Sequence, residues 1–127
     1  MLKYAFSPKP EKSAKAYGQA LRISQRNALP VCRAISGLPL EKGRKLLKDL
    51  LEKKRSLNGK YYTKTVKEIL KLLESAASNA EFKGLDPKKL IIYASAHKGF
   101  TFHRPRKFKM GRQRRKVANV QIVLIQK

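Results

Sequence analysis

The sequence predicts an α+β fold: three helices packed on one face of a small three-stranded antiparallel sheet, with one long protruding β-hairpin. Two apolar runs rich in β-branched residues, Leu90 to His97 and Val117 to Gln126, flank a polar segment, as the strands of a hairpin do. Three earlier stretches repeat apolar residues at helical spacing. We expect a single domain over residues 1–127, because the chain contains no internal repeat and no linker.

The register of the predicted hairpin follows from its apolar pattern. When the chain is folded about Phe108, the even-numbered residues from Leu90 to Ala96 share one face with those from Ala118 to Leu124. Side chains alternate between the faces of a sheet, so a slip of one residue would place the two apolar sets on opposite faces. We therefore expect the pairing that is symmetric about Phe108.

The predicted hairpin is too long for the body that carries it. About 18 residues separate Leu90 from Phe108, roughly 60 Å of extended chain, whereas a compact chain of this length has a radius of gyration of about 14 Å. Residues 98–116 contain nine basic residues and no acidic one. We therefore expect a projecting arm over about 98–116 and a globular body over about 1–97 and 117–127.

Residues 15–23 are predicted to form the first strand, after a proline-containing loop. Alternation places four of its side chains on one face: Tyr17, Gln19, Leu21 and Ile23. A helix is the alternative for this stretch, and an internal glycine disfavours it. Ser24 is the expected N-cap of the first helix, which Gly37 ends. If Asn27 were the cap instead, Pro30 would fall in the first turn, where proline is tolerated.

Two further helices precede the hairpin. The second is predicted from residue 39 to about 54, and its apolar stripe consists mainly of leucines. The third carries apolar residues between Val66 and Ala80 at intervals of three and four. Thr65 and Glu68 fit a capping box at its N-terminus, and a start one turn earlier is the alternative. We expect all three helices to cover the same face of the sheet.

The charge of the chain indicates a polyanionic partner. Its 31 basic and 8 acidic residues give a formal net charge of +23, which destabilises a compact state through self-repulsion. Nucleic acid is the first candidate and an anionic membrane surface the second. We find no apolar run of transmembrane length and no signal-peptide pattern, and the single cysteine is compatible with a reducing compartment. We expect a cytoplasmic protein without a membrane anchor.

The sequence lacks the residue patterns of an enzyme. Its carboxylates are scattered, and none follows Asp86. No spacing of histidine and cysteine suits zinc, and no glycine-rich loop precedes a helix as a phosphate-binding turn would. Cys32 falls on the apolar stripe of the first helix, where a buried, inert thiol is expected. We therefore expect no catalytic residue, no metal and no cofactor.

The basic arm is the candidate binding site. Cationic side chains neutralise phosphates, and aromatic rings such as Phe100 and Phe102 can stack on unpaired bases. A solvated basic loop that binds nothing specific is the alternative interpretation. The predicted RNA-binding residues of the arm and the body are Lys98, Arg104, Arg106, Lys107, Lys109, Arg112, Arg114, Arg115, Lys116, Lys15, Arg22, Arg26 and Arg33.

Four stretches of the chain also carry a family resemblance. They run from Ala14 to Ser24, Val31 to Gly37, Lys71 to Asp86 and Ala94 to Gly99, the last followed by Pro105-Arg106 and Gly111-Arg112. In this order they resemble the universal large-subunit ribosomal protein L-twenty-two family, called L-seventeen in older eukaryotic naming, and its archaeal and eukaryotic branch most. The chain departs from that branch in its short connection at 56–62, in Gln25 where proline is usual, and in Lys109-Met110.

The resemblance implies a structural role without a chemical step. Members of the family bind large-subunit ribosomal RNA, lie beside neighbouring ribosomal proteins, and help to line the nascent-peptide exit tunnel with their hairpin. By position, the tip nearest the tunnel and the nascent polypeptide is Arg106, Lys107, Phe108, Lys109, Met110, Gly111 and Arg112. We expect no homo-oligomer. The alternative function is that of a non-ribosomal basic nucleic-acid-binding module of the chromatin or RNA-binding kind.

Overall fold

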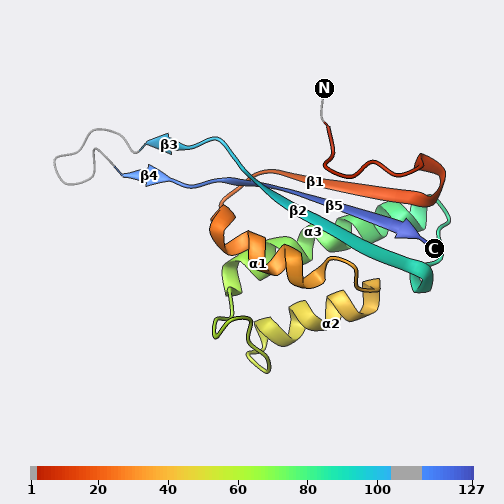
Figure 1. The fold of residues 1–127 in the computed structure, drawn as a ribbon, viewed down its shortest axis with the longest axis horizontal. Coiled ribbons are helices and arrows are strands. Elements are labelled where there is room, and N and C mark those ends of the chain that lie inside the picture. The colour runs from red at the N-terminus through yellow and green to blue at the C-terminus, as the bar shows by residue number, and fades with distance from the viewer. Residues whose placement is uncertain (1–2, 104–112) are drawn as a thin grey trace.

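The structure of the protein is a computed structural model that describes residues 3–103 and 113–127. A three-stranded antiparallel sheet of order β1-β5-β2 forms one layer, and three helices form the other (Figure 1). Two short 3-10 turns, η1 (Pro10–Lys12) and η2 (Pro87–Lys89), precede β1 and β2. The remaining elements are β1 (Ser13–Leu21), α1 (Gln25–Ile35), α2 (Leu40–Leu51), α3 (Thr63–Phe82), β2 (Leu90–Lys98), β3 (Phe102–His103), β4 (Arg114–Arg115) and β5 (Ala118–Gln126).

The β2–β5 pairing has the register that the sequence predicts. Leu90 lies opposite Gln126, Ile92 opposite Leu124, and the ladder continues without a shift to Lys98 opposite Ala118. The even-numbered residues of both strands point toward the helices, and all of them except the half-buried Ala94 are buried or lie at the strand ends. The α+β fold class, with three helices and a three-stranded sheet, is confirmed.

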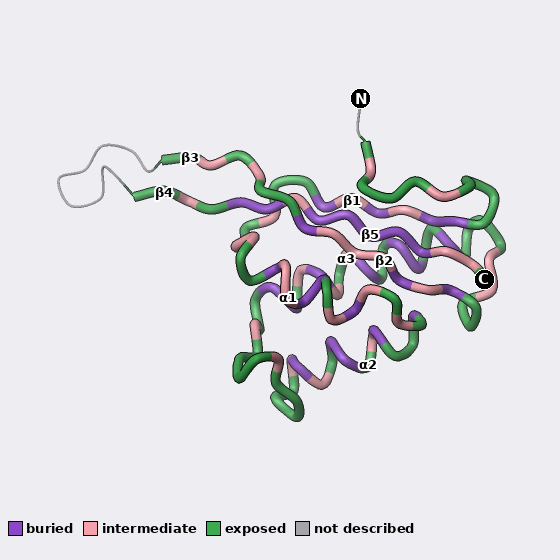
Figure 2. Tube along the Cα trace, in the orientation of Figure 1, coloured by how far each residue is buried: buried purple, intermediate pink, exposed green. Residues whose placement is uncertain are grey.

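The core lies between the sheet and the helices, where Figure 2 shows the buried residues concentrated. α1 packs against β2, α3 packs against β1 and β5, and α2 lies outermost against α3. The side chains that are both large and fully buried come from every layer: Ile35, Leu40, Leu47, Leu50, Ile69, Leu73, Leu90, Ile92, Ile122, Leu124, Val31 and Val66. Burial of this apolar surface is the main stabilising term of the fold.

The predicted side-chain pattern of the first strand is wrong. Tyr17 lies opposite Gln121 on the face away from the helices, whereas Leu21 lies opposite Ala118 on the helical face. A bulge between Gly18 and Leu21 inserts one extra residue, and an extra residue reverses the alternation beyond it. Ala20 takes the left-handed conformation there, with a φ of 55°, and donates its N–H to Asn119 Oδ1 at 2.9 Å.

The helix boundaries confirm some expectations and correct others. α1 begins directly after Ser24, which is therefore the N-cap in place of Asn27, and Pro30 lies inside the helix. α2 ends at Leu51, three residues before the predicted end. α3 starts at Thr63, so Thr65 is a buried residue of the helix and does not form a capping box with Glu68. The local pattern fitted a cap, but the earlier start lets Thr65 face the core.

The two outer strands of the sheet are covered by neighbouring segments. Beside β2, Gly37 N–H donates to the Ile92 carbonyl at 2.7 Å, and Ile92 N–H donates to the Leu38 carbonyl at 3.0 Å. Beside β1, Asn79 Nδ2 donates to the Lys15 carbonyl, and Lys83 Nζ donates to the Ser13 carbonyl, both at 2.9 Å. These contacts occupy backbone groups that would otherwise be open to strand addition.

The N-terminal segment lies over the face of the sheet that no helix covers (Figure 1). Gln121 accepts the N–H of Ala5 at 2.9 Å and donates its amide to the Lys3 carbonyl at 3.0 Å. Phe6 stacks on Tyr93, with 4.8 Å between the ring centroids. This cover explains why Gln121 and Val123 are buried although their side chains point away from the helices.

Candidate nucleic-acid interface

A short strand pair continues the sheet past the helical layer. β3 and β4 pair antiparallel, with Phe102 opposite Arg115 and His103 opposite Arg114, and Figure 1 shows no helix beneath them. Phe100 and Phe102 are exposed here, at 79% and 37%. The predicted tip, Arg106 to Arg112, and the predicted contact Arg104 lie outside the described residues, so those assignments stay predictions.

The strand pair is connected to the body through a close backbone contact. Gly99 N–H donates to the Val117 carbonyl at 2.9 Å. A Cβ atom at Gly99 would lie 2.9 Å from that same carbonyl oxygen, so a larger residue would push the two backbones apart. From Lys98 to Phe102 the chain advances four residues while its partner advances three, from Ala118 to Arg115, which shifts the register by one residue.

Arg22 connects the strand pair to the segment between β1 and α1. Its guanidinium lies 4.9 Å from the centroid of the Phe102 ring, a cation–π contact. The sequence places Arg22 on the body and Phe102 on the arm, and the structure brings them together. An arginine stacked on one aromatic ring keeps donors free for a phosphate.

Residues from three segments, four of them cationic, line a cavity of about 260 Å³. It is lined by Ser24, Gln25, Arg26, Lys98, Thr101, Arg114, Lys116 and Val117. Four predicted RNA-binding residues, Arg26, Lys98, Arg114 and Lys116, are therefore neighbours in space. The cavity lies at the N-terminal end of α1, where the backbone N–H groups of a helix are directed outward.

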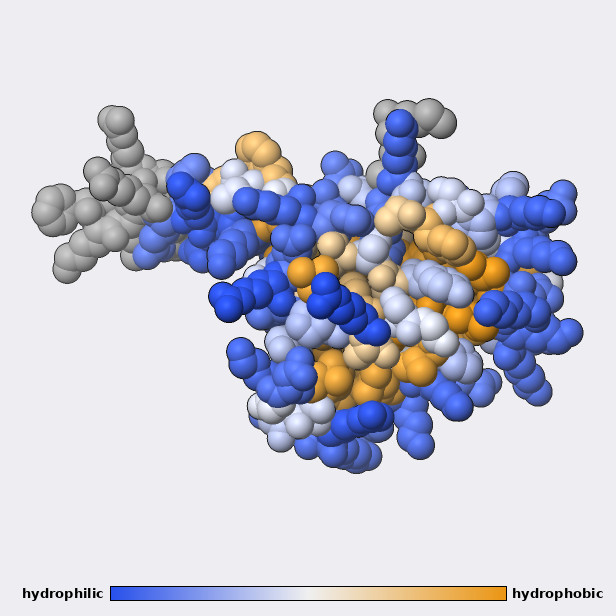
Figure 3. All heavy atoms as spheres, in the orientation of Figure 1, coloured by the Kyte–Doolittle hydropathy of each residue, from blue (hydrophilic) through white to orange (hydrophobic). Residues whose placement is uncertain are grey.

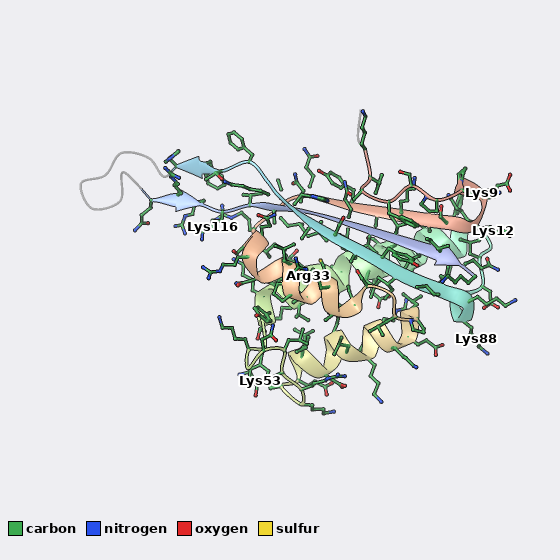
Figure 4. All side chains as sticks on the ribbon, in the orientation of Figure 1. Lys9, Lys12, Arg33, Lys53, Lys88 and Lys116 are labelled. Carbon is green, nitrogen blue, oxygen red and sulfur yellow. The ribbon has the colours of Figure 1, made fainter. Side chains whose placement is uncertain are left out.

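Other predicted contacts lie apart from this cavity. Lys15 is on the sheet face under the N-terminal segment, with its ammonium 5.0 Å from the centroid of the Tyr4 ring. Arg33 is exposed in the last turn of α1 (Figure 4). Figure 4 also shows Lys9, Lys12 and Lys88 at the end of the molecule remote from Lys116. Lys15 and Arg33 therefore lie apart from the cavity, whereas Arg26 lines it and Arg22 contacts Phe102.

Few carboxylates balance these cations. Three ion pairs occur in the described part of the chain, Arg44–Glu74, Lys54–Glu52 and Lys71–Glu68, and all lie on the helices or the loop after α2. Residues 87–127 contain no aspartate or glutamate. Hydrophilic side chains dominate the β3–β4 end and the rim of the face in Figure 3, while hydrophobic ones gather over its middle.

Two kinds of feature are absent from the described residues: a cluster of metal-ligating side chains and a membrane-spanning helix. Within 3–103 and 113–127, no three His, Cys, Asp or Glu side chains come together as a metal site would require. In the same ranges, no helix combines the length and apolar character needed to cross a bilayer. Burial raises the pKa of the Cys32 thiol to about 12, so it is not a nucleophile at neutral pH.

Sequence reasoning missed the polar lining of the cavity. Ser24, Gln25 and Thr101 were not among the predicted contacts, although Ser24 was predicted as an N-cap. A helix start next to several cations is a signal for an anion site in the sequence itself. What the sequence did not reveal is that Lys98, Thr101 and residues 114–117 lie beside that helix start.

The fold and its surface define a small, strongly basic α+β protein whose sheet is prolonged by a cationic strand pair. The family model described as Ribosomal protein L22p/L17e matches residues 16–124. The chain belongs to this family of ribosomal proteins, as its four characteristic stretches predicted.

Individual relatives agree with this assignment. The large ribosomal subunit protein uL22 of Archaeoglobus fulgidus is 39% identical over 128 aligned positions, covering 83% of each chain. That of Methanocaldococcus jannaschii is 36% identical, covering 84% of this chain and 83% of the relative. That of Methanococcus aeolicus is 33% identical, covering 97% and 95%. All three are archaeal, which confirms the predicted branch.

The alignments also show that the relatives carry additional residues. An alignment of 146 positions to the Methanococcus aeolicus protein exceeds the 127 residues of this chain. Some residues of that relative therefore have no counterpart in this chain.

Proposed function

We propose that this chain is a structural constituent of the large ribosomal subunit that binds ribosomal RNA. The observation that carries the proposal is the cationic end of the molecule, where Arg26, Lys98, Arg114 and Lys116 line one cavity and, among the described residues, no carboxylate lines it. Family membership and relatives named as large-subunit proteins support it. A polyanion would remove the repulsion among these cations, and RNA is the polyanion of a ribosome.

In this proposal the chain is one domain, and its body and its arm contact RNA separately. The body, about 1–97 and 117–127, would rest on the RNA through Lys15, Arg22, Arg26 and Arg33. The arm, about 98–116, would run between RNA segments through its nine basic residues, and its tip at 106–112 would lie nearest the exit tunnel and the nascent polypeptide. Phe100 and Phe102 are exposed enough to stack on unpaired bases.

The proposed mechanism is neutralisation and positioning. On single-stranded RNA, the logarithm of the binding constant falls with the logarithm of the salt concentration by about 0.7 for each phosphate contact. Nine contacts would therefore give a slope of about −6. Such contacts hold RNA segments together during assembly and shape a passage. No chemical step and no cofactor are part of the proposal. The partners would be ribosomal RNA and neighbouring ribosomal proteins in the cytoplasmic ribosome, and the chain would not form a homo-oligomer.

A sucrose gradient of lysate from the native source tests this function. We expect the chain to sediment with the large subunit in moderate salt and to remain there after a high-salt wash, since an embedded protein is not released by competing counterions. Release into the light fractions would favour a peripheral or non-ribosomal nucleic-acid-binding role.

A matched pair of variants makes the test specific to the interface. Lys98→Gln, Arg114→Gln and Lys116→Gln together remove three cavity cations, whereas Lys9→Gln, Lys12→Gln and Lys88→Gln remove three exposed cations at the remote end. We expect the first triple variant to be displaced at lower salt than the second. Equal displacement would show that only total charge matters.

A further inference from the structure

A cavity lies between the strand pair and α1, and four of the residues that line it are cationic. Arg26 comes from the first turn of α1, Lys98 from the end of β2, and Arg114 and Lys116 from the returning strand. The fold thus brings cationic residues from three separate segments to the wall of one cavity. Meeting of like charges is unfavourable unless an anion lies between them.

Within the described residues, no protein carboxylate fills that role. Each ion pair of this part of the chain lies elsewhere, and no Asp or Glu lines the cavity. The first turn of α1 also contains no acidic residue and instead contains Arg26, a cation where the helix dipole favours an anion. Both features disfavour the empty cavity and favour one occupied by an anion.

The lining also supplies hydrogen-bond donors suited to a tetrahedral anion. The Ser24 side chain makes no capping bond to α1, which leaves its hydroxyl available. Thr101 adds a second hydroxyl, and Arg26 and Arg114 add planar guanidinium groups that bind phosphate oxygens in pairs. A volume of about 260 Å³ is several times the share of about 30 Å³ that one water takes in the liquid, which leaves room for one phosphodiester group with some hydration.

We propose that this cavity binds a single backbone phosphate of RNA, shared by Arg26, Lys98, Arg114 and Lys116. The proposal rests on the proposed RNA-binding function and deepens it, because it makes these cations one site and not four independent contacts. The bound phosphate joins the N-terminus of α1 to the start of the strand pair. Together with the Arg22–Phe102 contact, it sets the direction in which the strand pair leaves the body.

A double-mutant cycle separates one shared phosphate from independent contacts. The variants are Arg26→Gln, Lys116→Gln and the pair of substitutions, and the measured quantity is the dissociation constant for a large-subunit ribosomal RNA transcript at several salt concentrations. We expect each single variant to bind about 10-fold more weakly than the unaltered protein. Two independent contacts would make the double variant about 100-fold weaker, whereas a shared phosphate predicts about 10- to 30-fold. The salt slope should fall by about 0.7, one phosphate, in all three variants.

Lys88→Gln combined with Lys116→Gln is the matched control, because Lys88 lies at the remote end of the molecule and its effect should multiply with that of Lys116. Multiplying effects of Arg26→Gln and Lys116→Gln, with a slope that falls separately for each, would overturn the shared site and leave RNA binding intact. Binding of the unaltered protein without salt dependence would overturn the proposed function itself. Thermal melting of every variant confirms that the fold is retained.

Discussion

Cys32 shows how burial sets the chemistry of a single residue. Its side chain is 2% exposed in α1, and burial raises the pKa of the thiol from 9.0 to about 12. Between these values the unfolded chain loses the thiol proton while the folded chain keeps it. The folded state then binds more protons, so this residue's contribution to the free energy of unfolding falls as pH rises from about 9 to about 12, by up to about 1.4 kcal/mol per pH unit.

A comparison with Cys32→Ala isolates this contribution from the lysines and tyrosines that titrate in the same range. We expect the variant to be less stable at pH 8, because it leaves a small cavity, and the difference from the unaltered protein to shrink by pH 10.5. Urea unfolding at the two pH values measures it. A difference that stays constant would mean that the thiol ionises equally in both states.

Gly43 is required by packing and not by backbone conformation. It lies in α2, and a Cβ atom added there would overlap the Cδ1 methyl of the fully buried Ile92. Overpacking costs about 1–3 kcal/mol, whereas replacing glycine by alanine within a helix gains about 1 kcal/mol. The overlap outweighs the gain, so we expect Gly43→Ala to destabilise the fold by about 1 kcal/mol.

Ile92→Val supplies the matched background for this prediction, because it removes the methyl that the new side chain would overlap. In that background we expect Gly43→Ala to be neutral or stabilising in urea unfolding. A loss of the same size in both backgrounds would show that the added methyl meets another part of the core.

At the scale of elements, the N-terminal segment is hydrogen-bonded to a side chain of the central strand. Gln121 bonds to the backbone of Lys3 and Ala5 and lies on the sheet face that the helices leave open. We expect Gln121→Ala to release the segment while the helical core stays folded, since that core lies on the other face. Limited proteolysis should then cleave before Ser13 at least several-fold faster, with melting still cooperative. Unchanged cleavage would show that the Phe6–Tyr93 stack is sufficient.

The strand pair is expected to be dispensable for folding of the body. Among the described residues, the core cluster includes none between Ala96 and Ala118. Replacing residues 102–114 by a short turn should therefore leave cooperative melting within a few degrees of the full chain, while RNA binding weakens and its salt slope falls. Loss of cooperative melting would mean that the segment packs on the body.

The sequence predicts best those elements in which the alternation of apolar residues allows only one alignment of the strands. The β2–β5 register followed from two apolar sets that only one alignment places together. The bulge in β1 was missed because it depends on Ala20 in a left-handed conformation, which its side chain does not indicate. The capping box predicted at Thr65 does not form, although the local residue pattern fits one. α3 begins at Thr63, so Thr65 lies inside the helix and faces the core. The cavity was missed because its lining comes from residues far apart in the chain.

For the whole molecule, the high net charge lowers the stability of the free protein through self-repulsion. The charge of +23 is opposed in the described residues by only three ion pairs, each partly exposed and worth about 0–1 kcal/mol. Raising the salt concentration from 0.1 to 1 M shortens the Debye length from about 10 to about 3 Å, which screens the self-repulsion more than it weakens these pairs. We expect the melting temperature in sodium chloride to rise by about 5 °C over this range. A fall would show that the ion pairs dominate.

The order of the strands also fixes when the body folds. β1 and β2 each pair with β5 and not with each other, and β5 is synthesised after both. At about 5–20 residues per second, roughly 5 to 20 seconds separate the completion of β1 from that of β5. Until β5 is made, the helices cannot pack on a complete sheet, and the backbone groups of β1 and β2 that pair with β5 have no hydrogen-bond partner. The nascent chain is therefore most open to aggregation and proteolysis just before its last strand is made.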